Sequence, residues 1–111
     1  MTRYYVRVDD LGVARGSDAS LSWSGQSPQD LAQSIERSLR DGALIGRWRD
    51  AQEAPEDVDA GLLATDPDAT VTIEDKAHSV ALVITTRLPH RLVSQRLNLL
   101  IGPHWTLGDV K

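Results

Sequence analysis

Three histidines, His78, His90 and His104, are the side chains of this sequence best suited to proton transfer or metal binding near neutral pH. A zinc site is usually recognised in a sequence by two histidines at helical spacing, an H-E-x-x-H motif or nearby cysteines. The sequence has none of these, and it contains no cysteine. We therefore expect isolated surface histidines, no metal site and no cofactor.

Carboxylates are the second group that could do chemistry. Nine of the sixteen acidic residues, and none of the twelve basic ones, fall between Asp50 and Asp75. The pairs Asp57/Asp59 and Asp66/Asp68 are suggestive oxygen donors for Ca²⁺, but an EF-hand loop begun at the first of them puts a glycine where an oxygen ligand belongs. We interpret the segment as a solvated acidic helix end and loop.

Glycines and serines match no catalytic or nucleotide-binding motif. The glycines fit neither G-x-G-x-x-G nor G-x-x-x-x-G-K-[ST], and the serines between positions 20 and 27 fit neither G-x-S-x-G nor S-x-x-K. Catalytic groups converge in space rather than in sequence, so a small enzyme or small-ligand-binding domain, with a site assembled from His and carboxylate side chains, stays as the alternative function.

Arginine and tryptophan are combined in Arg47-Trp48-Arg49, as they are in many interfaces. A tryptophan at the edge of the core beside two solvated arginines would give the same pattern. The formal net charge of −4 and the acidic segment both disfavour nucleic acid, whose phosphates require basic residues.

These features favour a non-catalytic protein-interaction module, which would be an adaptor, accessory or neutralising partner of another protein. The acidic segment predicts that this partner is basic. The predicted interaction residues on polar surfaces are Glu56, Asp57 and Asp59 of the acidic segment, together with Arg47, Trp48 and Arg49.

The chain of 111 residues has the size of one domain, which we place at residues 1–111. The order of its patterns predicts an α+β two-layer sandwich: a mainly antiparallel sheet of four to five strands, covered by two to three helices. Strand-like ranges are 3–9, 19–24, 43–49, 70–74, 79–86 and the tail 104–110, which is a possible edge strand. We expect 3–9 and 19–24 to form one hairpin, and 70–74 and 79–86 another, through a turn at 75–77. The range 79–86 is apolar on both faces, which predicts a central strand.

Helix signals occur at three places. Ser27 is a good N-cap, Leu31, Ile35 and Leu39 recur every four residues, and Gly42 follows the last turn. A second, short acidic helix is predicted from Pro55 to Leu63, and a third over residues 90–101, ended by Gly102-Pro103.

The apolar residues of the third predicted helix sweep about 200° of its surface, more than one core-facing stripe needs. Arg96 lies inside this arc, which leaves two alternatives. Either its stem packs along the core and its charged head reaches water, or the helix has a second apolar contact. Part of the set Val93, Leu97, Leu100 and Ile101 would then face a partner, which makes a homodimer possible. The competing expectation is that the tail with Trp105 and Leu107 folds over this face.

No stretch of the sequence approaches the roughly 20 apolar residues of a membrane span, and the N-terminus lacks the pattern of a secretory signal. With the absence of cysteine, this predicts a cytoplasmic protein that does not associate with a membrane.

Overall fold

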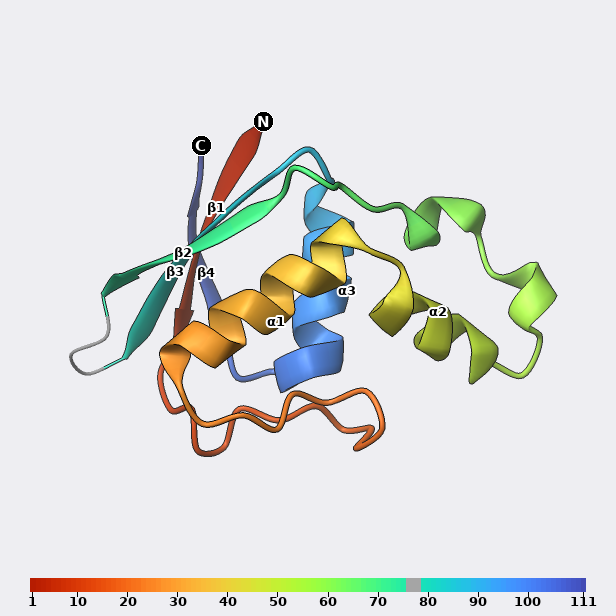
Figure 1. Ribbon diagram of the computed structural model, residues 1–111, viewed down its shortest axis with the longest axis horizontal. Helices are drawn as coiled ribbons and strands as arrows, with labels where there is room; N and C mark the ends of the chain where they lie inside the picture. Colours follow the sequence, from red (N-terminus) through yellow and green to blue (C-terminus); the bar gives the residue numbers. More distant parts are fainter. Residues whose placement is uncertain (76–78) are drawn as a thin grey trace.

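The computed structural model describes residues 1–75 and 79–111, and a four-stranded antiparallel sheet forms one side of the molecule (Figure 1). The strands lie in the order β2-β3-β1-β4, and the sheet with its helices confirms the predicted α+β class. Residues 76–78 lie outside the described residues, and with them His78 and most of the predicted turn at 75–77. Of that turn, the structure describes only the backbone of residue 75. The strand bounds are Thr2–Val8 for β1, Thr70–Asp75 for β2, Val80–Thr86 for β3 and Thr106–Val110 for β4.

Alternation along the strands determines which face of the sheet is buried. Tyr4 lies opposite Ile84 and Val6 opposite Leu82 in the pairing of β1 with β3, and all four side chains are buried. As expected, β3 lies inside the sheet, β2 pairs with it, and the tail adds β4 at the edge beside β1.

Helix α1, Pro28–Arg40, begins where the sequence indicates. The Ser27 hydroxyl accepts a hydrogen bond of 3.0 Å from the Asp30 amide, which satisfies one of the free N–H groups of the first turn. Leu31, Ile35 and Leu39 are fully buried on the face that packs against the sheet.

The expected strand at 43–49 is wrong, because Ala43–Asp50 forms helix α2. Leu44 and Ile45 are neighbours and both are buried, whereas a strand would direct them to opposite faces. Over so short a range, alternation and helical periodicity fit the same apolar positions, so the pattern did not separate them.

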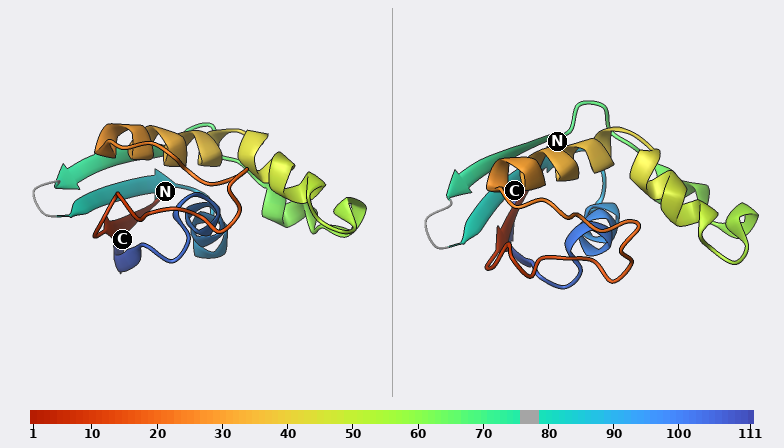
Figure 2. Two further views of the ribbon diagram at one scale, coloured as in Figure 1. Left: turned by 90° about the horizontal axis from the view of Figure 1, so that it is seen from below. Right: turned by 60° about the horizontal axis from the view of Figure 1, so that its bottom comes forward.

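The acidic helix predicted from Pro55 to Leu63 is instead two 3₁₀ segments, η1 at Pro55–Asp57 and η2 at Ala60–Leu63. Val58 is extended between them, and the Asp59 side chain accepts a hydrogen bond from the Gly61 amide, a local bond that competes with helical pairing. Together with α2 they form an arm, residues 43–64, that projects from the body (Figure 2). The molecule measures 43 × 30 × 19 Å along its principal axes.

The predicted strand at 19–24 is also wrong, since this segment is irregular and crosses the end of α3, His90–Ile101. The Trp23 amide donates to the Leu100 carbonyl at 2.8 Å, so its backbone bonds to a helix end rather than to a sheet. Leu21 and Trp23 are buried, and their alternation with serines reflects packing on α3.

The broad apolar arc of α3 is covered within the chain. Val93, Leu97, Leu100 and Ile101 are at most 6% exposed, so the expected exposed patch is wrong. Arg96 is fully buried as well, and its head does not reach water. The helix does have a second contact beyond the sheet, with the arm and the segment around Trp23.

The predicted stop of α3 is present at Gly102, whose φ of +62° is a conformation that favours glycine. A Cβ at this position would lie 2.6 Å from the Arg15 carbonyl oxygen, so glycine also permits the close approach of two backbones. Within the described residues, none of the helices has both the length and the apolar character that a membrane span requires.

Candidate functional site

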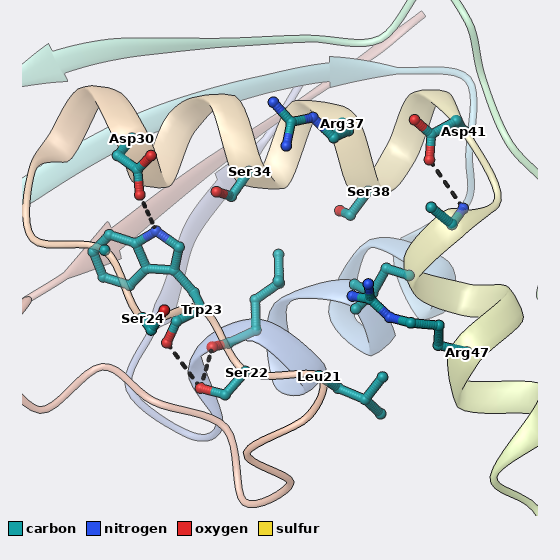
Figure 3. Close-up of a pocket in the computed structure, with 14 residues that line it drawn as sticks. Leu21, Ser22, Trp23, Ser24, Asp30, Ser34, Arg37, Ser38, Asp41 and Arg47 are labelled. Atoms are coloured by element: carbon teal, nitrogen blue, oxygen red, sulfur yellow. Dashed lines mark hydrogen bonds between the residues drawn. The ribbon is translucent and has the colours of Figure 1, made fainter.

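A pocket of about 480 Å³ lies between α1, α2 and the irregular segment 21–25 (Figure 3), and Leu100 of α3 also lines it. We refer to it as the α1–α2 pocket. Its volume falls in the range of small-molecule sites, about 300–1,000 Å³.

The polar side of α1 supplies one wall of the pocket. These residues recur at spacings of three and four, which places them on one side of a helix, away from the leucines that pack on the sheet. They are Asp30, Ser34, Arg37, Ser38 and, at the C-cap, Asp41.

The opposite wall is fixed by Trp23. Its indole Nε1 donates to the Asp30 carboxylate at 2.7 Å, a bond that ties the irregular segment to the first turn of α1 (Figure 3). The Arg15 guanidinium lies 4.9 Å from the centre of the Trp23 ring and donates to the Gly25 carbonyl at 2.9 Å. A wall without regular secondary structure is therefore held by side-chain bonds.

Ser22 and Ser38 line the pocket, and the hydroxyl of each is hydrogen-bonded to backbone carbonyls. Ser38 is buried and donates to the Ile35 carbonyl at 2.6 Å, and Ser22 lies within 2.9 Å of the Trp23 carbonyl and 3.3 Å of the Leu100 carbonyl. Among the described residues neither hydroxyl is hydrogen-bonded to a histidine, the arrangement that activates a serine nucleophile.

The two histidines that the structure describes, His90 and His104, lie at opposite ends of α3. His90 lies beside Ser94, with 3.3 Å between the ring Nε2 and the hydroxyl, and its ring centroid is 6.1 Å from that of Tyr4. His104 is exposed in the turn after α3. Among residues 1–75 and 79–111, no three His, Asp or Glu side chains are grouped so that they could hold a metal ion.

Two arginines, Arg37 and Arg47, supply positively charged hydrogen-bond donors to the pocket. Arg47 extends from α2 into the space below α1, and Arg37 lies along the α1 wall (Figure 3). Neither has a carboxylate within 4 Å in the described part of the chain, whereas Arg40, Arg49 and Arg87 each form an ion pair there. The pocket therefore holds cationic donors that the fold itself does not use.

The predicted trio Arg47-Trp48-Arg49 is divided by α2. Arg47 lines the pocket, Trp48 is half-buried against the core, and Arg49 pairs with Asp50 at 3.3 Å. Successive helical residues point in different directions, so the three do not form one surface.

The predicted acidic residues Glu56, Asp57 and Asp59 are all exposed on the arm, in and beside η1. The predicted apolar residues Val93, Leu97 and Leu100 are all buried in the core, and Leu100 also lines the α1–α2 pocket. The structure therefore keeps the acidic group together and separates it from the apolar one.

Asp66 and Arg96 are two buried charged side chains with different partners. The Asp66 carboxylate accepts from the Arg87 amide and the Thr86 hydroxyl, both at 2.8 Å, and from the Asp68 amide at 3.0 Å. These bonds, that from the Arg87 amide above all, hold the pKa of Asp66 below its usual range, against the opposing effect of burial. Asp66, one of the suggested Ca²⁺ donors, is thus an internal hydrogen-bond acceptor.

Arg96 fastens the arm to α3. Its guanidinium donates to the Leu62 carbonyl at 3.2 Å and the Ala64 carbonyl at 2.7 Å, and its Nε has no partner within the described residues. Burial lowers the pKa of Arg96 below its usual value.

Sequence reasoning missed Trp23, Arg37 and Ser34 as pocket residues. The polar side of α1 was a usable signal, because its spacing places those side chains on one line. The position of Trp23 had no comparable signal, since it depends on a backbone bond to Leu100, far along the chain.

Comparisons with protein-family models, with curated proteins and with solved structures each found no match to this chain. Its function is therefore argued from its own residues.

Proposed function

We propose that this protein is a non-catalytic interaction module whose arm binds a basic surface of another protein. The observation that carries the proposal is the state of Glu56, Asp57 and Asp59. All three are exposed, and none has a basic nitrogen within 4 Å in the described ranges 1–75 and 79–111. Their charges are therefore available to a partner.

The arm is an ordered support for these charges. Arg96 bonds the carbonyls on either side of Leu63, and Leu62 packs against the core cluster. The Asp59 side chain also fixes the turn at Gly61 through a 2.9 Å bond. A surface that is already ordered loses less conformational entropy when it binds.

The charge pattern indicates the class of partner. A concentrated negative field attracts a positive surface, raises the rate of encounter and repels phosphate backbones. Basic proteins therefore fit the arm better than nucleic acids do.

The test is a comparison of three tagged proteins as baits: the wild type, a triple arm variant and a matched control. The arm variant carries Glu56→Gln, Asp57→Asn and Asp59→Asn, in which asparagine still accepts the bond from Gly61. The control carries Asp9→Asn, Asp10→Asn and Glu74→Gln, which remove the same charge from exposed positions on the sheet side.

Asp10 is a close match for Asp59, because it accepts an equivalent bond of 2.8 Å from the Gly12 amide. We expect the wild type and the control to capture the same basic protein from a host lysate, and the arm variant to lose it. Equal capture of that protein by all three baits would contradict the proposal.

A further inference from the structure

We infer that the α1–α2 pocket binds a small organic anion, a carboxylate or phosphate attached to an apolar or aromatic body. This inference does not rest on the acidic arm. Its starting point is the pair Arg37 and Arg47, which line one pocket from two helices and have no carboxylate within 4 Å in the described residues.

Arginine suits this role because its planar head bonds carboxylate and phosphate oxygens in pairs. Arg47 is the principal candidate, since its side chain extends into the open space of the pocket (Figure 3). The hydroxyl of Ser34, on the same wall as Arg37, is half-buried and adds a further donor.

The pocket also contains two carboxylates, and each has a partner of its own. Asp30 accepts the 2.7 Å bond from Trp23, and Asp41 accepts a 3.0 Å bond from the Ala43 amide. They lie near opposite ends of α1, about 16 Å apart along its axis at 1.5 Å per residue. Along this axis, Arg37 lies between the two carboxylates.

The apolar half of the ligand is indicated by the base of the pocket. Leu21, Leu44, Leu100 and the indole of Trp23 line it, and each is largely buried by the rest of the fold. Most of the other residues that line the pocket are polar or charged, so these four side chains are its main apolar part. A ligand with a charged head and an apolar ring would use both parts.

The test uses four small probes that share one ring: phenylacetate, phenyl phosphate, phenylacetamide and phenethylammonium. The readout is the NMR signal of the Trp23 indole N–H, assigned with Trp23→Phe. The indole N–H of Trp105, bonded to Asn98 outside the pocket, is the internal reference. We expect a saturable shift of the Trp23 signal with one or both anions. The dissociation constant should be roughly 1 mM for ligands of this size.

Two neighbouring arginines of α2 give a matched pair of variants. Arg47→Gln should weaken the anion by roughly 10-fold to 100-fold, the effect of losing a charge-assisted bond. Arg49→Gln removes the same charge from an arginine that pairs with Asp50 outside the pocket, and should change affinity less than about twofold.

Comparison of phenylacetate with phenyl phosphate identifies which anion the pocket prefers. Equal binding of the neutral amide would overturn the inference, as would tighter binding of the cation, which would make Asp30 and Asp41 the ligand-binding groups. Absence of any saturable shift with either anion to about 20 mM, well above the expected constants, would also overturn it.

Discussion

Replacing Asp66 by asparagine should destabilise the fold strongly, although the two side chains have nearly the same shape. Asp66 is 3% exposed, and its two oxygens accept three hydrogen bonds. An asparagine keeps one oxygen, so its NH₂ group must face at least one of these donors. The backbone of Asp66 also donates to Leu39 at 2.7 Å, so the site joins the end of α1 to the end of β3.

The size of the effect follows from these bonds. One buried donor left without an acceptor costs about 1–3 kcal/mol, and each remaining bond weakens when its acceptor becomes neutral. We expect Asp66→Asn to lower the free energy of unfolding at pH 7 by about 3 kcal/mol, measured by urea denaturation. The control is Asp68→Asn, which removes an exposed 3.5 Å ion pair with Arg87 and should cost less than about 0.5 kcal/mol.

The pH dependence gives a second readout. The pKa of Asp66 is lower in the folded chain than its ordinary value of 3.8, so the unfolded chain binds the proton more readily. Its stabilisation is therefore complete well above pH 3.8 and is lost as the pH falls through the folded pKa. The difference between the wild type and Asp66→Asn should shrink below about pH 4. A loss under 1 kcal/mol at pH 7, or a difference that does not change with pH, would refute the reasoning.

Three further predictions concern two glycines and the attachment of the arm. Gly46→Ala should raise the free energy of unfolding by about 0.5–1 kcal/mol in urea denaturation, because Gly46 lies inside α2 and an added Cβ would have no described atom within 4 Å apart from its chain neighbours and its own helix backbone. Gly102→Ala should lower this free energy by at least about 2 kcal/mol, since its φ is positive and the Arg15 carbonyl is close. A destabilising Gly46→Ala would speak against a helix there. Arg96→Met should accelerate amide hydrogen exchange over residues 60–64 by roughly 10-fold or more, as the carbonyls of Leu62 and Ala64 lose their donor, and unchanged exchange would show that the arm is held by other contacts.

Elements whose conformation depends mainly on neighbouring residues in the sequence were predicted correctly. The Ser27 cap with its leucine spacing located α1. Alternation located β1, and the apolar character of both faces of 79–86 identified β3 as an inner strand. Segments whose conformation depends on distant partners were predicted incorrectly. The alternation at 19–24 arises from packing on α3, and the apolar positions of 43–49 fit two periodicities.

The candidate site was predictable only in part. The acidic residues of the arm could be found from charge alone, and they are exposed together as such a run usually is. The α1–α2 pocket depends on where Trp23 and Arg47 meet α1, a tertiary arrangement that no sequence spacing encodes. Burial of Arg96 was likewise invisible, because its acceptors are backbone carbonyls.

The most direct test of the proposed function is the association rate constant with the captured basic partner, measured by stopped flow between about 50 and 500 mM salt. For the wild type and the sheet-side control, we expect this rate constant to fall by about tenfold or more over that range, because salt screens attraction to Glu56, Asp57 and Asp59. The triple arm variant should associate more slowly at low salt and show a flatter salt dependence. If its rate constants match those of the wild type at every salt concentration, the arm does not attract the partner and the proposed function is wrong.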